Sequence, residues 1–289
     1  MDDQALARQF ELHRTHLRAV AYRILGSLNE ADDAVQESWL RLIRSDHASL
    51  ANLRAWLTTV VARVCLDMLR ARREQPGGLR VPDPILNDID ELDPEQQLLL
   101  AGSVGLALQV VLETLGPAER IAFVLHDVFA IPFDEIAPIV GRSEAAARQL
   151  ASRARRRVQG ASTVPDPDLN RQREVVDAFY AAARRGDFDA LLVLLDPDVV
   201  VRADFGALPL SASREVRGRK AVAREVLEFA SFAEFARPAL VNGAAGAVAA
   251  SSGRLRAVVG FTVVRGKIVE IDILADPERL GRLQLTARN

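Results

Sequence analysis

Residues 132–158 read PFDEIAPIVGRSEAAARQLASRARRRV, and this stretch decides how the middle of the chain folds. A short apolar segment at helical spacing stops at Gly141, a residue that readily takes the left-handed conformation of a tight turn between helices. Ser143 then stands where a helix N-cap is expected, and Glu144 follows in the first turn, where the helix dipole favours an acid. This order predicts a helix-turn-helix, with a support helix, a tight turn and a recognition helix.

The second helix of this pair has two different faces. Its apolar face carries Ala147, Leu150, Ala154 and Val158, and its other face carries Ala145, Arg148, Gln149, Ser152 and Arg156. Arg148 and Gln149 are long enough to reach base edges, and the arginines at 153 and 155–157 supply charge for phosphates. The alternative is a helical hairpin whose basic face is only solvated. Pro138, inside the short first helix, is expected to bend or shorten it.

The composition describes a folded chain with room for two or three domains. It has 289 residues, of which 49% are hydrophobic, and this excludes a disordered protein. No apolar run is long enough to span a membrane, and the first residues lack the order of a signal peptide, so we expect a cytoplasmic, nucleoid-associated protein. Cys65 is the only cysteine, which excludes an intrachain disulfide and a cysteine metal site. The net charge of −2 does not suggest DNA binding, but arginines cluster at 70–73 and 153–157.

Residues 1–75 have helical periodicity throughout. Asn29 is a candidate cap for a helix whose inner face carries Ala31, Val35, Ser38 and Leu42. Another face of that helix carries Asp33, Gln36, Glu37 and Leu40. This acidic face with one exposed leucine is either solvated surface or a docking surface for a basic partner helix.

A long helix is expected over residues 53–73, LRAWLTTVVARVCLDMLRARR. Trp56, Val60, Val64 and Leu69 fit its core face, while the charged residues lie toward the other side. Trp56 is therefore either a core residue or a platform on which a base stacks.

Two stretches rich in proline and acidic residues divide the chain, and the last third changes character. There, amphipathic helices are followed by β-rich segments, and Val264-Arg265-Gly266-Lys267 has the pattern of a hairpin turn. We expect a multidomain protein with two all-α domains and one α+β domain that has a curved antiparallel sheet. The expected boundaries are 1–75 and 96–160 for the helical domains, 76–95 and 161–170 for linkers, 171–279 for the α+β domain and 280–289 for a tail.

The order of three motif blocks carries a family resemblance. DDAVQESWLRL, then LRAWLTTVVARVCLDMLR, then LGPAERIAFVLHDVF with FDEIAPIVGRS and RQLASRARRR resemble regions 2 and 4 of bacterial extracytoplasmic-function sigma factors, over about residues 5–160. The last third, with GDFDALLVLLDPDVVVRAD, resembles the SnoaL-like branch of the NTF2-like fold. Sigma factors with such an appended domain form a known subgroup. The resemblance implies a promoter-specificity subunit with no cofactor, whose partners are core RNA polymerase, through its β′ clamp helices and β flap, and promoter DNA.

The resemblance also implies roles for residues. The set that matches the polymerase-docking surface is Asp33, Gln36, Glu37 and Leu40. The set that matches the surface opening and reading the −10 element is Asn52, Arg54, Trp56, Thr59, Arg63, Asp67 and Arg70, with the loop from His47. The set that matches the −35 reading helix is Ser143, Ala145, Ala146, Arg148, Gln149, Ser152 and Arg153.

The appended domain carries the expected regulatory contact. Members of the subgroup often have an Asp-Gly-Gly-Gly segment, for which this chain has Asp204-Phe205-Gly206-Ala207. The set that matches the family's closing motif is Asp276, Pro277, Glu278, Arg279 and Leu280. We expect this segment to pack against the linker between the two sigma domains, or against region 2, so that the domain replaces a separate anti-sigma factor. A small ligand is a further candidate partner, and a passive appendage is the alternative.

Two other functions compete with the sigma-factor interpretation. One is a one-component transcription regulator whose last domain binds a ligand. The other is a cyclase or isomerase, because SnoaL-like domains can be enzymes that use an acid or base in their pocket. The last third holds no histidine, and its candidate bases are Asp204 and Asp272.

Overall fold

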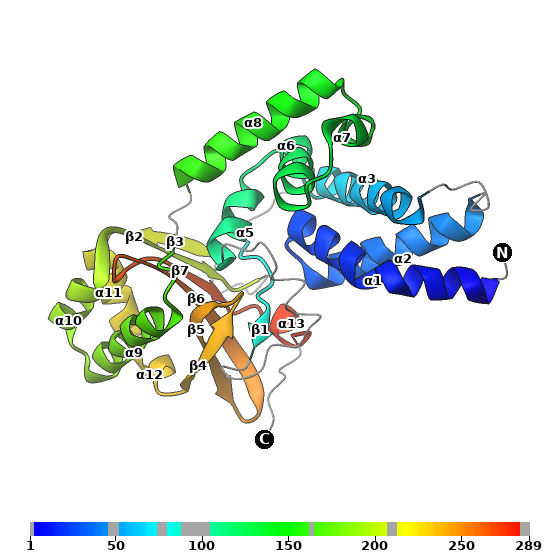
Figure 1. The fold of residues 1–289 in the computed structure, drawn as a ribbon. Coiled ribbons are helices and arrows are strands. Elements are labelled where there is room, and N and C mark those ends of the chain that lie inside the picture. The colour runs from blue at the N-terminus through cyan, green and yellow to red at the C-terminus, as the bar shows by residue number, and fades with distance from the viewer. Residues whose placement is uncertain are drawn as a thin grey trace. The chain divides into compact units, whose positions relative to one another are not determined.

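The chain forms two compact units (Figure 1). The structure, a computed structural model, describes residues 3–45, 52–73, 80–87, 105–161, 165–206 and 213–283. Unit 1 comprises residues 1–77, 97–102 and 111–161, and unit 2 comprises residues 78–96, 103–110 and 162–289. The expected DNA-reading loop from His47 to Ala51 and parts of both expected linkers lie outside the described residues.

Three long helices form the first part of unit 1: α1 (Asp3–Leu25), α2 (Leu28–Arg44) and α3 (Leu53–Arg73). Each packs against the other two. The expected inner face of α2 is buried in full, which confirms the spacing argument. The expected cap was wrong, because Ser27 rather than Asn29 caps α2 by accepting a hydrogen bond from the Glu30 amide at 3.5 Å. Trp56 is only half-buried, whereas Val60, Val64 and Leu69 belong to the core.

The second part of unit 1 is a helix-turn-helix with its supporting helices. Its elements are α6 (Pro117–Phe123), the π-helix η2 (Val124–Val128), α7 (Phe133–Val140) and α8 (Glu144–Ala161), and α5 (Gly105–Glu113) precedes them. Gly141 has φ 66° and ψ 43°, as the tight turn requires, and the Ser143 hydroxyl accepts a hydrogen bond from the Ala146 amide at 3.3 Å. Pro138 lies within α7, which has only eight residues. Leu150, expected on the inner face of α8, is only partly buried, and Ala151 is buried beside Ala147 instead.

Unit 2 is built on a seven-stranded sheet of order β1-β4-β5-β6-β7-β2-β3. The strands are β1 (Leu86–Asn87), β2 (Leu195–Asp204), β3 (Arg214–Arg217), β4 (Ala236–Val241), β5 (Ala244–Ser251), β6 (Arg254–Val264) and β7 (Lys267–Leu274). The expected α+β class is confirmed, but the sheet is not wholly antiparallel, since β2 pairs with β7 in parallel. Strands so far apart in sequence can pair in parallel because helices carry the chain between them. The expected hairpin turn is confirmed, with positive φ at Arg265 and Gly266.

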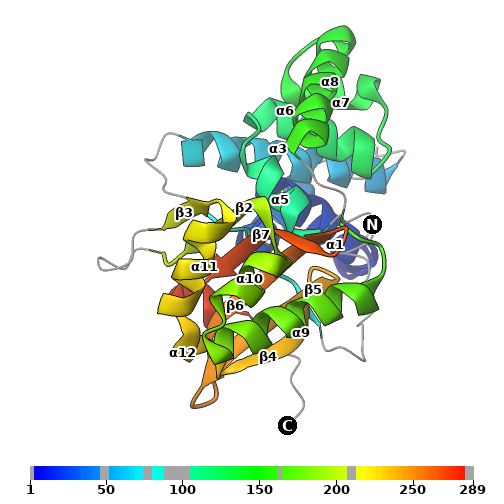
Figure 2. The same cartoon turned by 90° about the vertical axis from the view of Figure 1, so that its left-hand side faces the viewer.

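Helices cover one face of this sheet (Figure 2). They are α9 (Leu169–Arg185), α10 (Phe188–Leu194), α11 (Arg219–Glu228) and α12 (Ala230–Ala233). Buried residues of α9, α10 and α11 form one core with the sheet. A second core forms around Val81, Leu106, Val258 and Leu280, the last from α13 (Pro277–Leu280). Unit 2 therefore includes segments that precede the helix-turn-helix in the sequence.

Part of the expected linker is an integral piece of unit 2. Leu86 pairs with Val241 and Asn87 with Leu240, so β1 adds an edge strand to the sheet. The amide of Ile85 donates to the Asn242 side chain at 2.6 Å, and the Asn242 amide donates to the Ile85 carbonyl at 2.8 Å. The residues expected to be an irregular linker thus contain an ordered segment that is anchored on the C-terminal domain.

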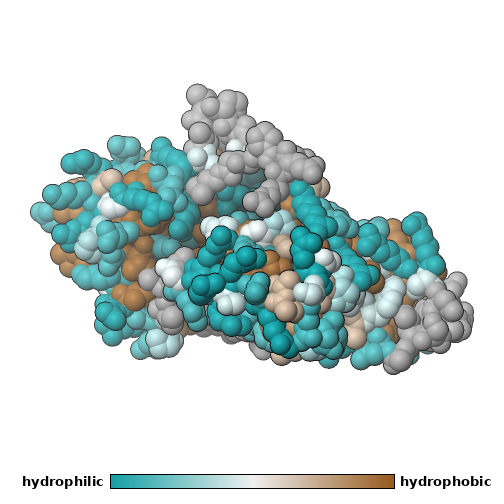
Figure 3. Space-filling view, turned by 90° about the horizontal axis from the view of Figure 1, so that it is seen from above, coloured by the Kyte–Doolittle hydropathy of each residue, from teal (hydrophilic) through white to brown (hydrophobic). Residues whose placement is uncertain are grey.

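The surface of the described part is mainly hydrophilic on the face shown in Figure 3, with hydrophobic residues in separate patches. Among the described residues, no helix has both the length and the apolar character to cross a bilayer.

Candidate nucleic-acid interface

The expected −35 reading surface lies on the exposed side of α8. Ala147, Ala151, Ala154 and Val158 are buried against the rest of the motif. All seven expected reading residues lie on the exposed side, with Ala146 alone partly buried. Arg148 is paired with Glu144 one turn earlier, and its guanidinium lies 5.7 Å from the ring centroid of Phe133. A helix that presents small residues, Gln149 and Arg148 together can enter a major groove and place donors at base edges.

Most of the arginines at the basic end of α8 are engaged in ion pairs, which the sequence did not indicate. Arg157 pairs with Glu119 at 2.6 Å, and Arg153 with the same carboxylate at 3.4 Å. Arg155 pairs with Asp127 at 2.6 Å. Within the described part of the chain, Arg156 is exposed and forms no ion pair. The acidic partners lie 28 or more residues away in sequence, so the spacing of the arginines gave no signal of these pairs.

The expected −10 residues lie along one side of α3. Arg54, Arg63, Asp67 and Arg70 are exposed, while Trp56 and Thr59 are half-buried. Asn52 caps α3, since its side-chain oxygen accepts a hydrogen bond from the Ala55 amide at 3.1 Å. Trp56 is thus neither fully buried in the core nor fully exposed.

The two helical parts of unit 1 are joined by contacts that the sequence analysis missed. Arg72 of α3 pairs with Glu113 at 3.5 Å, and the buried Arg120 donates to the same carboxylate at 3.1 Å. The rings of His16 and Phe129 meet edge to face at 5.7 Å. Burial, together with the charges of Arg54 and His13, lowers the pKa of His16 to about 4. His16 is therefore neutral at pH 7, as a residue packed at this junction should be.

The expected docking face of α2 is accessible. Asp33 and Gln36 are exposed, and Leu40 keeps 38% of its surface exposed. Glu37 is half-buried and pairs with Arg41 at 2.9 Å. Ile43, which the sequence analysis did not select, is 48% exposed one turn further along the helix. This face combines acids with two exposed aliphatic side chains, and this is the composition that a basic partner helix with an apolar stripe would match.

A cluster around Arg279 ties the segment Val81–Asp83 to the C-terminal domain, and we call it the linker clamp. The Arg279 guanidinium donates to Asp83 and Asp204, each at 2.7 Å, and to the Val81 carbonyl at 2.6 Å. Asp204 also accepts from the Val81 amide at 3.0 Å. Arg279 has 13% of its side chain exposed, so these charge-assisted bonds are shielded from water.

The sequence motifs of the C-terminal domain meet at this clamp. Asp276 caps α13 through hydrogen bonds from the Glu278 and Arg279 amides, and this cap positions the Arg279 side chain. Gly206 has φ 67°, and a Cβ at this position would lie 2.5 Å from the Asp276 carboxyl carbon. Asp204 also accepts from the Gly206 amide at 3.0 Å. The two segments that the resemblance singled out are thus in direct contact, although about 70 residues separate them.

Neither candidate catalytic base faces an open site. Asp204 belongs to the linker clamp. Asp272 is 2% exposed and accepts from Arg202 at 3.2 Å. Burial raises the pKa of Asp272 to about 7, against the opposing effect of Arg202 and with a further upward effect of Glu270. In the described residues, no group of three or more potential ligands is arranged to hold a metal ion.

Comparison with known proteins agrees with the order of the motifs. The Sigma-70 region 2 family matches residues 9–75, and the "Sigma-70, region 4" family matches residues 105–158. The chain is 41% identical over 299 residues to the ECF RNA polymerase sigma factor SigJ of Mycobacterium tuberculosis, a match that covers 97% of this chain and 95% of SigJ. It is 34% identical over 278 residues to the probable ECF RNA polymerase sigma factor SigI of the same species, with 94% and 93% covered.

A solved structure extends this likeness to the whole fold. The crystal structure of the M. tuberculosis extracytoplasmic function sigma factor SigJ matches with a TM-score of 0.78 and 39% identity, and the match covers 97% of this chain and all of that one (100%). The resemblance inferred from the three motif blocks and from the appended α+β domain is therefore confirmed.

Proposed function

This chain belongs to the ECF RNA polymerase sigma factors, and we propose which of its surfaces bind the polymerase and which read the promoter. Its partners are core RNA polymerase and promoter DNA. The exposed side of α8 reads the −35 element, the exposed side of α3 reads and opens the −10 element, and the α2 face docks on the β′ clamp helices, with region 4 also contacting the β flap. The observation that carries the proposal is the division of α8, in which Ala147, Ala151 and Ala154 are buried while Arg148 and Gln149 are exposed.

The docking face supports a charge-steered encounter with a basic helix. Asp33 and Glu37 supply acid, and Leu40 and Ile43 supply apolar area beside it. Complementary charge raises the association rate and fixes the orientation, and burial of the two aliphatic side chains then slows dissociation. Ile43 extends the expected docking set by one residue.

The C-terminal domain acts as a built-in regulator through the linker clamp. The clamp holds Val81–Asp83, which lies between the two DNA-binding regions in sequence, and β1 fixes the next residues on the same domain. A domain on the same chain is present at an effective concentration of about millimolar for a short flexible connection, so even a weak contact is populated. Holding this segment limits how far regions 2 and 4 can separate on a promoter, and a separate anti-sigma factor is then not required.

The decisive experiment measures binding and transcription with purified core polymerase. Glu37→Lys should weaken core binding about tenfold or more, since a reversed charge meets a basic partner. Glu11→Lys is the matched control, because Glu11, although more exposed than Glu37, is also a helical glutamate paired with a nearby arginine, at 3.2 Å. Run-off transcription from a promoter selected by the full-length protein should fall with Glu37→Lys and be retained with Glu11→Lys.

Two outcomes would contradict the assignment. Unchanged core binding by Glu37→Lys would move the docking surface away from this face of α2. Sequence-specific DNA binding by the wild type without any core binding would favour the one-component regulator instead.

A further inference from the structure

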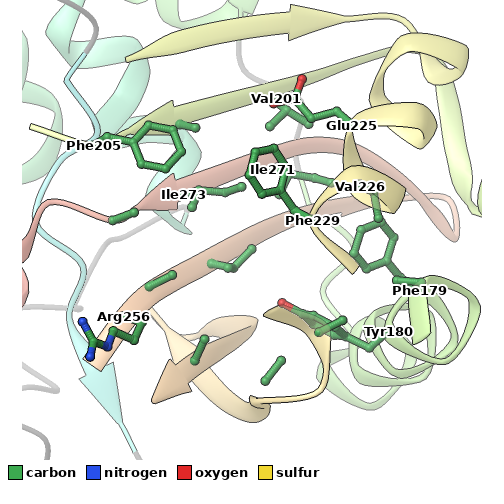
Figure 4. Close-up of a pocket in the computed structure, with 18 of the residues that line it drawn as sticks. Phe179, Tyr180, Val201, Phe205, Glu225, Val226, Phe229, Arg256, Ile271 and Ile273 are labelled. Carbon is green, nitrogen blue, oxygen red and sulfur yellow. The ribbon is translucent and has the colours of Figure 1, made fainter. Parts of the chain in front are cut away.

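Unit 2 contains a cavity that the linker clamp does not use (Figure 4). It lies between the sheet and helices α9, α11 and α12, and its volume is about 180 Å³. Its walls are almost entirely carbon and include several alanines, which leave the space open where larger side chains would fill it. An engineered apolar cavity of roughly 150 Å³ stays dry and binds benzene, so this one has room for a single small ring with a substituent.

Tyr180 is a polar group turned toward this space. Its ring packs edge to face against Phe179 and Phe261, with centroids 5.5 and 5.8 Å away. Its hydroxyl points into the cavity in Figure 4 and forms no hydrogen bond with any residue in the described part of the chain. Burial raises the pKa of Tyr180 above its ordinary value, so the hydroxyl stays neutral. A neutral donor that faces an apolar cavity favours an uncharged acceptor, since bringing an ion to it would cost desolvation.

The remaining polar groups of the wall leave the interior without net charge. Arg214 and Glu225 pair with each other at 2.6 Å, and the Arg214 guanidinium lies 5.2 Å from the ring centroid of Phe229. Arg256 is exposed at one end of the cavity. The interior therefore offers apolar surface and one neutral donor, while the charges are either paired or in contact with water.

We propose that this cavity binds a small, uncharged, mainly apolar molecule that carries one hydrogen-bond acceptor, of the chemical type of a monocyclic aromatic ketone. Tyr180 donates to the acceptor, and the alanine-lined wall holds the ring. The site deepens the regulatory role and rests on it, since the bound molecule would be the signal that the C-terminal domain senses.

The wall of the cavity is continuous with the linker clamp. Phe205 and Ala275 both line the cavity. Phe205 stands between Asp204 and Gly206, and the Ala275 amide donates to the Asp204 carbonyl at 2.7 Å. A molecule that displaces Phe205 or Ala275 therefore moves the backbone that carries Asp204. A molecule bound in the cavity therefore changes the position of Asp204, and with it the hydrogen bonds that hold Val81.

The test is titration calorimetry of the full-length protein with three probes of similar size. Acetophenone supplies a ring and a neutral acceptor, ethylbenzene lacks the acceptor, and benzoate replaces it with a charge. Acetophenone should bind more tightly than ethylbenzene by about three- to tenfold, the contribution of one hydrogen bond. Benzoate should bind more weakly than acetophenone. Tyr180→Phe should reduce acetophenone affinity to that of ethylbenzene and leave ethylbenzene unchanged.

Two alanine variants separate the cavity from the rest of the domain. Ala257→Leu places a larger side chain in the wall and should abolish binding of acetophenone and ethylbenzene, while Ala250→Leu, outside the cavity lining, should retain it. Thermal unfolding establishes that both variants are folded. Hydrogen exchange of residues 81–87 in saturating acetophenone should differ from that in its absence.

Several results would overturn the proposal. They are no binding of acetophenone by the wild type at millimolar concentration, equal binding by Ala257→Leu, or tighter binding of benzoate. Unchanged exchange at 81–87 despite binding would overturn the link to the clamp. Because calorimetry involves no transcription, a failure here is separate from a failure of the regulatory role itself.

Discussion

Arg202, on β2, faces three carboxylates, one on β3 and two on β7. It pairs with Asp272 at 3.2 Å, with Glu215 at 3.3 Å and with Glu270 at 3.4 Å. One cation therefore serves three acids, two of which are largely buried. The raised pKa of Asp272, about 7 against an ordinary value of 3.8, follows from this burial and from the shortage of positive charge.

Replacing Asp272 by asparagine should change how stability depends on pH. A carboxyl whose pKa is raised on folding binds its proton more tightly in the folded state, so its contribution to stability is lost as pH rises from about 4 to 7. Asp272→Asn removes this loss. From pH 4 to pH 8, the free energy of unfolding of the variant should therefore rise by roughly 2–4 kcal/mol relative to that of the wild type. Urea unfolding at several pH values measures the difference.

An exposed pair provides the control for this prediction. Glu278 and Arg282 form an ion pair one turn apart, and 74% of the Glu278 side chain is exposed. Glu278→Gln should therefore shift stability by less than about 1 kcal/mol at every pH. A parallel pH dependence of wild type and Asp272→Asn would show that Asp272 titrates at its ordinary pKa in the folded protein.

At the scale of elements, the arginines of helix α8 differ in whether an acid pairs with them, and this difference bears on the proposed contact with DNA. Arg156 is exposed and forms no ion pair in the described part of the chain, whereas Arg155 is paired with Asp127. An arginine that must first leave a protein carboxylate gains less free energy from binding a phosphate than an arginine that is only solvated. Arg156 should therefore contribute more to the salt dependence of binding than Arg155.

Binding of promoter DNA by three alanine variants tests the roles on α8. Arg156→Ala should weaken binding evenly across sequences and reduce the slope of log affinity against log salt by about one. Arg155→Ala should reduce this slope by less. Arg148→Ala should cost about 1–3 kcal/mol on the cognate −35 element and relax the preference at one position. Equal losses on cognate and scrambled DNA for Arg148→Ala would reject base reading by this side chain.

The sequence was informative where contacts are local and silent where they are long-range. The periodicity of α2 and α8 and the turn at Gly141 were predictable because each depends on residues within a few turns. Ser27 was not chosen as a cap because Asn29 has the same capacity, and only the position of the first helical turn separates them. Strand β1 is two residues long and pairs with a segment about 155 residues away, so no local pattern marks it.

The same limit applies to the candidate sites. The exposed sets on α2, α3 and α8 follow from helical spacing, and the motif resemblance assigned them roles. The partners of Arg279, Arg202 and Arg155 could not be predicted from spacing, since each pair joins elements that meet only in the folded protein. The cavity next to Tyr180 could not be predicted either, because alanines that line a cavity and alanines that fill a core look alike in a sequence.

At the scale of the whole molecule, the linker clamp is the contact through which we propose that the C-terminal domain acts on the sigma regions. A segment of the chain between regions 2 and 4 is bound by the domain that follows both. The strength of the clamp rests on Arg279, whose guanidinium meets Asp83, Asp204 and the Val81 carbonyl together.

Removing that side chain should free the linker segment and change promoter output. Arg279→Ala removes the guanidinium that Asp83 and Asp204 share, and breaking such a buried pair costs about 3–5 kcal/mol, so residues 81–87 should exchange amide hydrogens faster. Run-off transcription with core polymerase should differ from the wild type, and Asp83→Asn should change it in the same direction to a smaller extent. Arg282→Ala, three residues further along and about half exposed, is the control and should match the wild type. If Arg279→Ala releases the segment and transcription stays the same, the C-terminal domain is a passive appendage; if exchange itself is unchanged, Arg279 is not what holds the linker.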